Sequence, residues 1–349
     1  MDQIETNDRG VVQGDTWHRK EEFIRQEGPV TRDQLDWIFD YELAKVQLQM
    51  PIEMEPEVDL PDDGYSSLVD LKVKHVNVEG AYCIYRPDNQ TVLVPSVGER
   101  FTLLDASMFI DWVDMNLLTP YPDLHVESSG TLYGGQTRFI SIVLDEFQVA
   151  GDDSVTLNRI LFTDPIGKGA YQACMNQTRV VCDNTRRLAI HQGKKNNSFL
   201  SCSHTSNGES RIQGHMLDLA EIRLGLAAEN DRMDYFARTQ LTFVHVRRFL
   251  DFLYPTVDED GKPKQGRSLT IAQKKRDAIR SIFESQDGFS EAIAYSAYGL
   301  FNALSDFLGN QKGNTGFDVD LDNLTGQRAD QKDQAMLWLM ELCREINGF

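Results

Sequence analysis

Apolar residues alternate with polar ones in the middle of the chain, whereas on either side they recur at helical spacing. Short alternating runs over 67–97 predict a strand meander, and 124–147 and 155–163 predict further strands. The pair Gly134-Gly135 is typical of a hairpin turn. Between the runs, 106–117 has the spacing of a helix with one packed face. The middle of the chain therefore predicts an antiparallel sheet with one helix inserted.

The N-terminal part shows helical spacing instead of alternation. We expect a loose tail over 1–14 and a short helix over 17–27. Thr31, with Gln34 three residues later, forms a capping-box pattern that predicts the start of an amphipathic helix. The segment 50–64 is rich in Pro, Asp and Glu, which is typical of an exposed linker.

Helical spacing also dominates the second half of the chain. One predicted helix, over 170–192, carries Cys174, Val181, Thr185 and Leu188 on a single stripe. A polar, Gly-rich loop is expected over 309–328. Further helices are expected over 215–253 (as one long or two shorter helices), 269–285, 290–308 and 334–346.

These elements predict an α+β fold in which an antiparallel sheet in the middle of the chain is flanked and followed by helices. We divide the chain into an acidic N-terminal helical arm and linker over 1–64, a core domain over 65–310, and a loop with a C-terminal amphipathic helix over 311–349. The core domain comprises a sheet over 65–163 and a helical part over 170–310.

The composition is that of a folded chain without a membrane-spanning segment. Hydrophobic residues make up 41% of the chain and aromatic residues 9%, which is enough to build a core. No apolar run is long enough for a transmembrane helix, and the polar, acidic N-terminus does not resemble a secretory signal. The five cysteines, an odd number, are typical of reduced thiols. We therefore expect a cytoplasmic protein with no membrane partner.

The net charge of −19 argues against a uniformly basic nucleic-acid-binding protein, but the charges are segregated. Residues 1–70 hold 18 Asp and Glu against 6 Lys and Arg. In contrast, residues 159–212 hold 8 Lys and Arg against 3 acids, and residues 262–280 hold 7 against Asp277 alone. These two basic segments are either solvated faces or, if the fold brings them together, an anion-binding surface.

The candidate binding residues come from the two basic segments. The first set sits on and just after the predicted helix 170–192, where cations would also complement the helix dipole. The second set belongs to the predicted helix 269–285, although exposed Lys and Arg are common on any solvated helix. With Tyr133, Tyr171 and Phe199 as stacking rings, these cations suit single-stranded nucleic acid. The candidates are Arg179, Arg186, Arg187, Lys194, Lys195, Lys274, Lys275, Arg276 and Arg280.

No sequence motif points to a cofactor or to a catalytic residue. Gly167-Lys168-Gly169 lacks the hydroxyl that follows the lysine of a phosphate-binding loop, so we expect no ATP-driven motor. The alternate aspartates of 318–322 begin like a calcium loop, but Asn323 and Ala329 replace its glycine and glutamate, which favours a solvated turn.

Thiols and imidazoles gather in one stretch, and these are the side chains that bind zinc. No tight Cys-x-x-Cys pair is present there, and two of the thiols lie near an apolar stripe. Buried structural cysteines are therefore the favoured interpretation, and we expect no metal. The residues in question are Cys174, Cys182, His191, Cys202 and His204.

An ordered series of short patterns resembles one known family. The most specific is Arg179-Val180-Val181-Cys182-x-Asn184-Thr185. The others are Trp17-His18, Tyr85-Arg86-x-Asp88, Gly130-Thr131-Leu132-x-Gly134-Gly135, Gln172-Ala173 and Ala297-Tyr298 with Asn302-Ala303. In this order they resemble the phage/plasmid-like family known as domain of unknown function 932, over about residues 15–310. The chain departs from the family pattern at Arg19-Lys20, Tyr298, Phe307 and Asn310.

The resemblance implies no established activity. By analogy of phage context and of sheet-then-helix order, its members are similar to ATP-independent annealing proteins such as Erf, RecT and Red-beta. Such a protein needs a positive groove that neutralises phosphates, usually on a self-associating scaffold. We therefore expect a protein of a phage or plasmid that binds single-stranded nucleic acid, anneals it and forms homo-oligomers.

Two other interpretations stay open at this point. Strong acidity fits a factor that binds basic host proteins, and such a factor would show one continuous acidic face. A metal-dependent enzyme acting on nucleic acid would need carboxylates and a histidine to meet within reach of one ion. The candidates for that site are Asp105, Asp111, Asp114, His125, Asp145 and Glu146.

Overall fold

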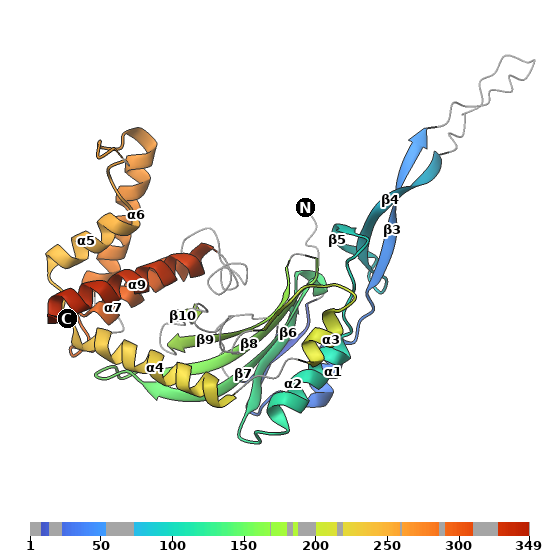
Figure 1. Cartoon of the computed structure of the whole chain (residues 1–349), viewed down its shortest axis with the longest axis horizontal. Helices are drawn as coiled ribbons and strands as arrows, with labels where there is room; N and C mark the ends of the chain where they lie inside the picture. Colours follow the sequence, from blue (N-terminus) through green and yellow to red (C-terminus); the bar gives the residue numbers. More distant parts are fainter. Residues whose placement is uncertain are drawn as a thin grey trace, which may run out of the picture.

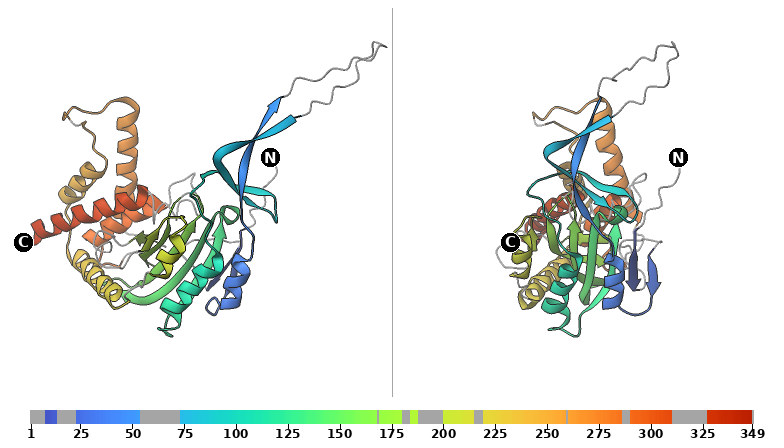
Figure 2. Two further views of the ribbon diagram at one scale, coloured as in Figure 1. Left: turned by 45° about the vertical axis from the view of Figure 1, so that its right-hand side comes forward. Right: turned by 90° about the vertical axis from the view of Figure 1, so that its right-hand side faces the viewer.

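The computed structural model describes residues 8–13, 23–53, 73–167, 169–179, 184–187, 200–214, 219–258, 260–285, 290–309 and 327–348. Within these ranges the chain forms a large sheet, a small sheet and a C-terminal group of helices (Figure 1). The small sheet lies at one end of the long axis and the C-terminal helices at the other, with the large sheet between them (Figures 1 and 2). The fold is therefore α+β, as the apolar pattern predicts.

The large sheet has eight strands in the order β10-β9-β8-β7-β6-β1-β2, and β11 also pairs with β9. Only β1 and β2 run parallel to each other among its pairs of described strands. The strands are β1 Gly10–Gln13, β2 Ile24–Gln26, β6 His125–Leu132, β7 Thr137–Gln148, β8 Val155–Pro165, β9 Tyr171–Arg179, β10 Asn184–Arg187 and β11 Leu200–Cys202. A tight turn over Tyr133–Gly135 joins β6 to β7, where the glycine pair predicts a hairpin.

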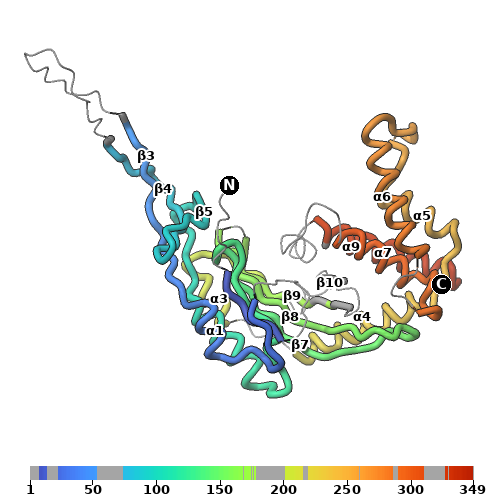
Figure 3. Tube along the Cα trace, turned by 180° about the vertical axis from the view of Figure 1, so that it is seen from behind, coloured from blue at the N-terminus to red at the C-terminus, as the bar shows by residue number. Residues whose placement is uncertain are grey.

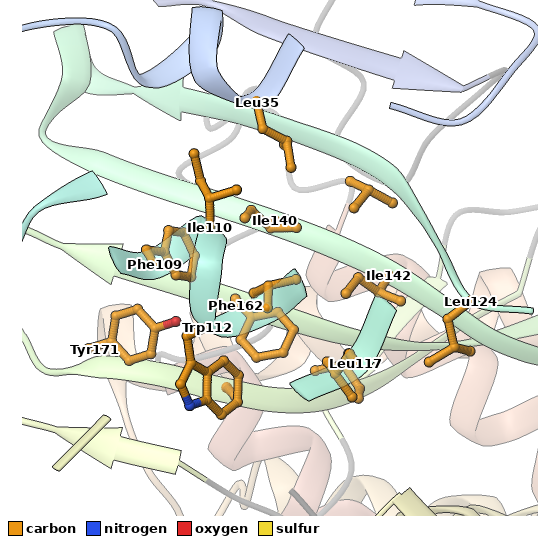
Figure 4. Packing of buried hydrophobic residues seen from close by; sticks show 14 of the residues in the cluster. Leu35, Phe109, Ile110, Trp112, Leu117, Leu124, Ile140, Ile142, Phe162 and Tyr171 are labelled. Carbon is orange, nitrogen blue, oxygen red and sulfur yellow. The ribbon is translucent and has the colours of Figure 1, made fainter. Parts of the chain in front are cut away.

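One face of the large sheet is apolar because alternate residues of its central strands are apolar. Ile140 and Ile142 of β7 pair with Phe162 and Ile160 of β8, and all four are buried. Trp112 packs against Phe162 with 5.6 Å between ring centroids (Figure 4). The helices that pack in this core are α1 Arg32–Phe39, α2 Ala106–Val113 with a π-helical turn over Asp114–Leu118, α3 Gly208–Gln213 and the start of α4 Leu219–Arg238.

The small sheet comprises β3 Ala44–Glu53, β4 Val73–Arg86 and β5 Thr91–Gly98, in the antiparallel order β3-β4-β5. Its core holds Ile84, Val94 and Val97 together with Ile166 from the end of β8. β5 pairs only with the Ala81–Arg86 half of β4. The other half of β4 continues outward with β3 as a two-stranded projection (Figure 1).

The C-terminal group of helices forms a second core. Helix α7 is buried along most of its length because apolar residues occur on all its sides, including Leu300, Leu304 and Leu308. Val149 and Phe147, at the end of β7, join this core to the large sheet. The helices are α5 Phe243–Leu253, α6 Gly266–Ser285, α7 Ala297–Gly309 and α9 Gln327–Asn347, with the second half of α4. No helix in the described ranges has both the length and the apolar character needed to cross a membrane.

The structure corrects the prediction for the N-terminal part. Val11 and Val12 are buried in β1, which pairs with β6, so the predicted tail is part of the large sheet. Residues 24–26 of the predicted helix form β2. Residues 50–53 of the predicted linker are strand, and 54–64 lie outside the described ranges. The described parts of this segment, 8–13 and 23–53, therefore contribute strands to both sheets as well as helix α1.

The packing of Phe23 explains why the N-terminal segment joins the large sheet. Its ring stacks on Phe139 of β7 at 6.1 Å between centroids. It also lies over Gly10 and Gly130, which face each other across β1 and β6. A Cβ at Gly10 or Gly130 would come within 2.3 or 2.5 Å of this ring. Two glycines thus open the space that the aromatic ring fills.

Candidate nucleic-acid interface

The first candidate set lies on strands and not on the predicted helix. Residues 171–179 form β9 and residues 184–187 form β10, so 170–192 is not helical where it is described. The reason is tertiary, because β9 pairs with the edge that β8 offers. Tyr171, Ala173 and Met175 pack alternately in the sheet core, a period-two signal that the helical stripe in the sequence obscured.

Basic positions concentrate on the edge strand of the large sheet. The register places Arg186 across from Gln177 and Arg187 across from Asn176. Arg179 ends β9, opposite the first residue of β10. Lys194 and Lys195 lie outside the described ranges.

The second candidate set lies on α6, as predicted. Lys274 is exposed and forms no ion pair with any described residue. Lys275 is half-buried, with Nζ 5.0 Å from the centre of the Tyr254 ring. The guanidinium of Arg280 lies 3.9 Å from Asp277 one turn earlier. Within this second set, Lys274 is thus the residue whose positive charge is least neutralised by other described residues.

Arg276 has a structural environment that sets it apart from its neighbours. It is buried, and its Nη1 lies 2.5 Å from Asp251 Oδ1 of α5 and 3.4 Å from the Tyr254 carbonyl oxygen. A buried cation that is already paired is costly to withdraw from its partner. In this structure Arg276 joins α6 to α5 and is not presented to a ligand.

Both candidate sets belong to elements that pack against one helix. β10 lies beside α7 and α9, and α6 packs along α7. Figure 3 shows α6 rising from the group of C-terminal helices that contains α7. Segments that are far apart in the sequence are therefore both attached to α7. A surface shared by the two basic segments requires that the fold bring them together, and their common attachment to α7 does so.

The predicted stacking rings have different environments. Tyr171 is fully buried and packs edge-on against Phe109, with 5.0 Å between ring centroids, so it is a core residue. Burial also raises the pKa of Tyr171 well above its usual value. Tyr133 is partly exposed at the turn between β6 and β7, where its φ is positive. Phe199 lies outside the described ranges.

A buried ionic cluster that the sequence did not predict joins the two sheets. Arg86 of β4 donates from Nε and Nη2 to Asp88, at 2.7 and 2.8 Å, and from Nη1 to the Gly134 carbonyl oxygen at 2.8 Å. The hydrogen bond from Arg86 lowers the pKa of Asp88. Tyr41 lies under Arg86, with 4.4 Å from the ring centre to Cζ, and donates to the Gly135 carbonyl oxygen.

A second buried group adjoins this cluster at the ends of β7 and β8. Arg138 donates to the Tyr41 hydroxyl at 3.1 Å and lies 3.5 Å from Asp164. His204 Nε2 lies 3.1 Å from Asp164 but out of line for a hydrogen bond, and its ring stacks on Phe101 at 5.0 Å. These contacts tie the turn after β11 to the start of β7, which is a structural role.

A third buried pair crosses the other face of the large sheet. Arg159 of β8 donates from Nε and Nη2 to the two carboxylate oxygens of Glu127, both at 2.6 Å. Glu127 occupies the irregularity of β6 between Val126 and Ser128, which turns its side chain toward the neighbouring strands. Arg159 belongs to the first basic segment of the sequence, yet its charge is neutralised within the sheet.

The described residues offer no metal-binding group. No three His, Cys, Asp or Glu side chains come together there in a way that could hold an ion, and the search includes Asp105, Asp111, Asp114, His125, Asp145 and Glu146. Cys202 is buried, and burial raises the pKa of its thiol, so the protonated form is favoured. Cys182, His191 and the aspartates of 318–322 lie outside the described ranges.

Several of the sequence patterns that suggested a family lie at junctions of the fold. Arg86 and Asp88 reach Gly134 between the two sheets. Tyr298 of α7 donates to Asp152 at 3.2 Å, at the junction of the C-terminal helices and the large sheet. The signal that could have found the ionic cluster is the pair Arg86-x-Asp88 itself, because it places opposite charges two residues apart, at the end of β4 and in the turn that follows it.

The comparisons with known proteins identify a family and nothing more specific. Comparison with curated proteins and with solved structures finds no match for the chain. A family model described as a domain of unknown function (DUF932) matches residues 94–338, so the match begins later and ends later than the sequence patterns suggest. Trp17-His18 and Tyr85-Arg86-x-Asp88 precede the matched region. Because the match covers more than half of the 349 residues, the chain belongs to the DUF932 family.

Proposed function

We propose that this protein binds single-stranded nucleic acid and promotes the pairing of complementary strands without a nucleotide-driven motor. The observation that carries the proposal is the attachment of both basic segments to α7, through β10 on one side and α6 on the other. A backbone of phosphates is longer than one ion pair, so it needs cations that are spread along a path. Two cationic elements beside one helix supply such a path.

The charge distribution supports a local binding surface. The chain as a whole has a net charge of −19 and would repel nucleic acid at long range, particularly at low salt. Screening confines each charge to roughly 10 Å at 0.1 M salt. A cationic edge strand and an exposed Lys274 therefore act on a bound strand largely independently of acidic residues that lie farther away. The resemblance to the phage/plasmid-like family supports a mobile-element context for this activity.

The test is fluorescence anisotropy of a labelled single-stranded oligonucleotide, at low and moderate salt and with and without magnesium. We expect saturable binding that weakens steeply with salt and needs no metal. A mixed-strand assay then follows the annealing of complementary oligonucleotides in the absence of ATP. Absence of binding at low salt would contradict the proposal and favour an acidic factor that binds basic proteins.

A matched pair of charge reversals separates the proposed surface from general charge effects. Arg186→Glu with Arg187→Glu changes the edge strand, and Arg238→Glu with Arg247→Glu makes the same charge change at well-exposed positions of α4 and α5. We expect the first variant to weaken binding by at least about tenfold and the second to have little effect. Equal weakening by both would contradict a surface at β10.

A further inference from the structure

The first half of α6 is more exposed than the second half. Of the ten residues 266–275, seven are exposed, Leu269 and Lys275 are half-buried, and Ala272 is buried. Three of the four buried residues of α6 lie in its second half. Figures 1 and 2 show α6 rising from the C-terminal helices, away from the large sheet. The first half of α6 is therefore supported on one side and open to solvent on the others.

Three exposed residues form the side of α6 that points away from the protein. Arg267, Thr270 and Lys274 follow one another at i, i+3 and i+7, so they share one stripe of the helix. Ala272, which packs in the core of the C-terminal helices, lies on the opposite side. No ion pair within the described residues involves Arg267 or Lys274. We call the three residues of this stripe the α6 outer face.

The charge around the α6 outer face is strongly positive. Residues 261–276 hold six Lys and Arg and no Asp or Glu. In the hairpin before α6, one carboxylate oxygen of Asp258 accepts two backbone hydrogen bonds, at 2.8 and 3.1 Å, so this acid is turned into its own loop. Asp277, which follows the basic stretch, lies 3.9 Å from Arg280. An anionic partner is therefore attracted to the first half of α6.

The dimensions of this half of the helix fit the major groove of DNA. An α-helix with its side chains is about 10–12 Å across, and the major groove of B-form DNA is about 12 Å wide. Residues 267–274 span about 10.5 Å along the helix axis, which corresponds to about three base pairs. A helix that is supported on one side and open on the others can enter such a groove.

The side chains of the α6 outer face are of the types that contact base edges in that groove. Arginine and lysine donate to O6 and N7 of guanine, and the methyl group of threonine contacts the methyl group of thymine. The major groove of duplex RNA is deep and narrow, so side chains do not read bases there. A helix with these residues in a row therefore selects duplex DNA over duplex RNA.

We propose that the first half of α6 enters the major groove of duplex DNA. Arg267, Thr270 and Lys274 then face the base edges, while Lys262 and Lys264 of the preceding hairpin lie near the phosphates. Duplex DNA is the product of the proposed annealing, but the inference rests on α6 and not on the binding of single strands. Lys274 belongs to both surfaces, whereas Arg267 and Thr270 belong to the α6 outer face alone.

The experiment measures the fluorescence anisotropy of a labelled duplex DNA, and of a duplex RNA of the same sequence, as the full chain is added. The variant is Arg267→Glu. We expect it to fold, because the side chain is exposed and a carboxylate is favourable in the first turn of a helix. Arg247→Glu is the matched control, since it makes the same charge change on α5, where the side chain is 77% exposed. Circular dichroism checks that both variants keep their helical content.

We expect the chain to bind duplex DNA at least about tenfold more tightly than duplex RNA. Arg267→Glu should weaken the binding of duplex DNA at least about tenfold, and the control should change it little. In the bound duplex, guanine N7 should be protected from methylation by dimethyl sulfate, because N7 lies in the major groove. Equal binding of the two duplexes, equal weakening by both variants or unprotected N7 would each overturn the proposal. Failure to bind duplex DNA at low salt would also overturn it.

The same titrations keep this inference separate from the proposed function. Binding of a single strand is tested by reversing charge at Arg186 and Arg187, and binding of duplex DNA is tested by reversing it at Arg267. If the chain binds duplex DNA but no single strand, only the annealing proposal is lost. If it binds a single strand but no duplex DNA, only the inference about α6 is lost.

Discussion

Three arginines of the two sheets and two cations of α6 are the same residue types in opposite situations. Arg86, Arg138 and Arg159 are buried and meet carboxylates or carbonyl oxygens inside the protein. Arg267 and Lys274 are exposed and unpaired within the described residues. The count of basic residues in a segment therefore says little about the charge that a ligand meets.

The physical reason for the difference is desolvation. A buried guanidinium loses its hydration and must be matched by oxygen acceptors, so its neighbours in the fold determine its role. An exposed cation on a helix keeps its hydration and adds to the field that a ligand or partner encounters. Substitutions in the sheets should consequently alter folding stability, whereas those on α6 should alter association.

The largest effect is expected at the pair between Glu127 and Arg159. Glu127→Gln leaves the buried guanidinium without a counter-charge and should lower the free energy of unfolding by about 3–5 kcal/mol. Chemical denaturation measures this loss. The double variant Glu127→Leu with Arg159→Met removes both charges and should recover most of the stability. A cost for Glu127→Gln below about 1 kcal/mol would contradict the view that the buried arginines, unlike the exposed cations of α6, depend on their internal partners.

A somewhat smaller effect is expected at the junction of the two sheets. Arg86→Ala removes the hydrogen bonds to Asp88 and Gly134 and the contact with Tyr41, and should cost about 2–4 kcal/mol. Asp88→Asn is the comparison variant, because it keeps an acceptor oxygen for Arg86 and alters a side chain that is 40% exposed, so it should cost less than Arg86→Ala. Denaturant midpoints of both variants test whether Arg86→Ala costs more stability than Asp88→Asn. A larger cost for Asp88→Asn would contradict this expectation.

The core of the C-terminal helices also contains a buried ionisable group, the thiol of Cys343. Its contribution to stability is tested at alkaline pH. Burial raises the pKa of Cys343 from 9.0 to about 11. The unfolded chain therefore loses this proton first, so stability falls as pH rises from 9 toward 11, by at most about 2–3 kcal/mol. Thermal melts at pH 8 and pH 10.5 should show a smaller drop for Cys343→Ala than for the unmodified chain. An equal drop in both proteins would contradict this assignment.

The smallest effect on stability is expected at Lys274 of α6. Lys274→Gln should change the free energy of unfolding by less than about 0.5 kcal/mol, because the side chain is exposed and unpaired within the described residues. The salt dependence of oligonucleotide binding should nevertheless become shallower, since one phosphate contact is lost. A destabilisation as large as that of Arg86→Ala would remove the distinction between the two regions.

Local sequence signals predicted the elements whose determinants are local. The capping box at Thr31 and Gln34 forms as expected, with each partner bonded to the other's backbone. The glycine pair produces the turn between β6 and β7, and 215–253 forms two helices, α4 and α5. In each case the hydrogen bonds or the apolar face are contained within a few turns or one hairpin.

The missed elements depend on distant partners. Residues 44–53 alternate Val46, Leu48, Met50 and Ile52 with polar residues, a strand signal hidden by the Pro and acidic residues that follow. The segment 170–192 carries the predicted helical stripe, but Arg179 belongs to β9 and Arg186 to β10, because a paired sheet edge outweighs a weak helical preference. Intrinsic propensity differs by less than 1 kcal/mol per residue, roughly, so tertiary pairing decides.

The sequence by itself determined the α+β class, the positions of most helices and the segregation of acidic from basic segments. Only the tertiary structure decided that Arg86, Arg138, Arg159 and Arg276 are internal while Lys274 faces solvent. It also brought β10 and α6 to one helix and left the outer halves of β3 and β4 as a two-stranded projection. Composition and periodicity act over a few residues, whereas burial of a charge and exposure of an apolar face depend on what the rest of the chain places beside them.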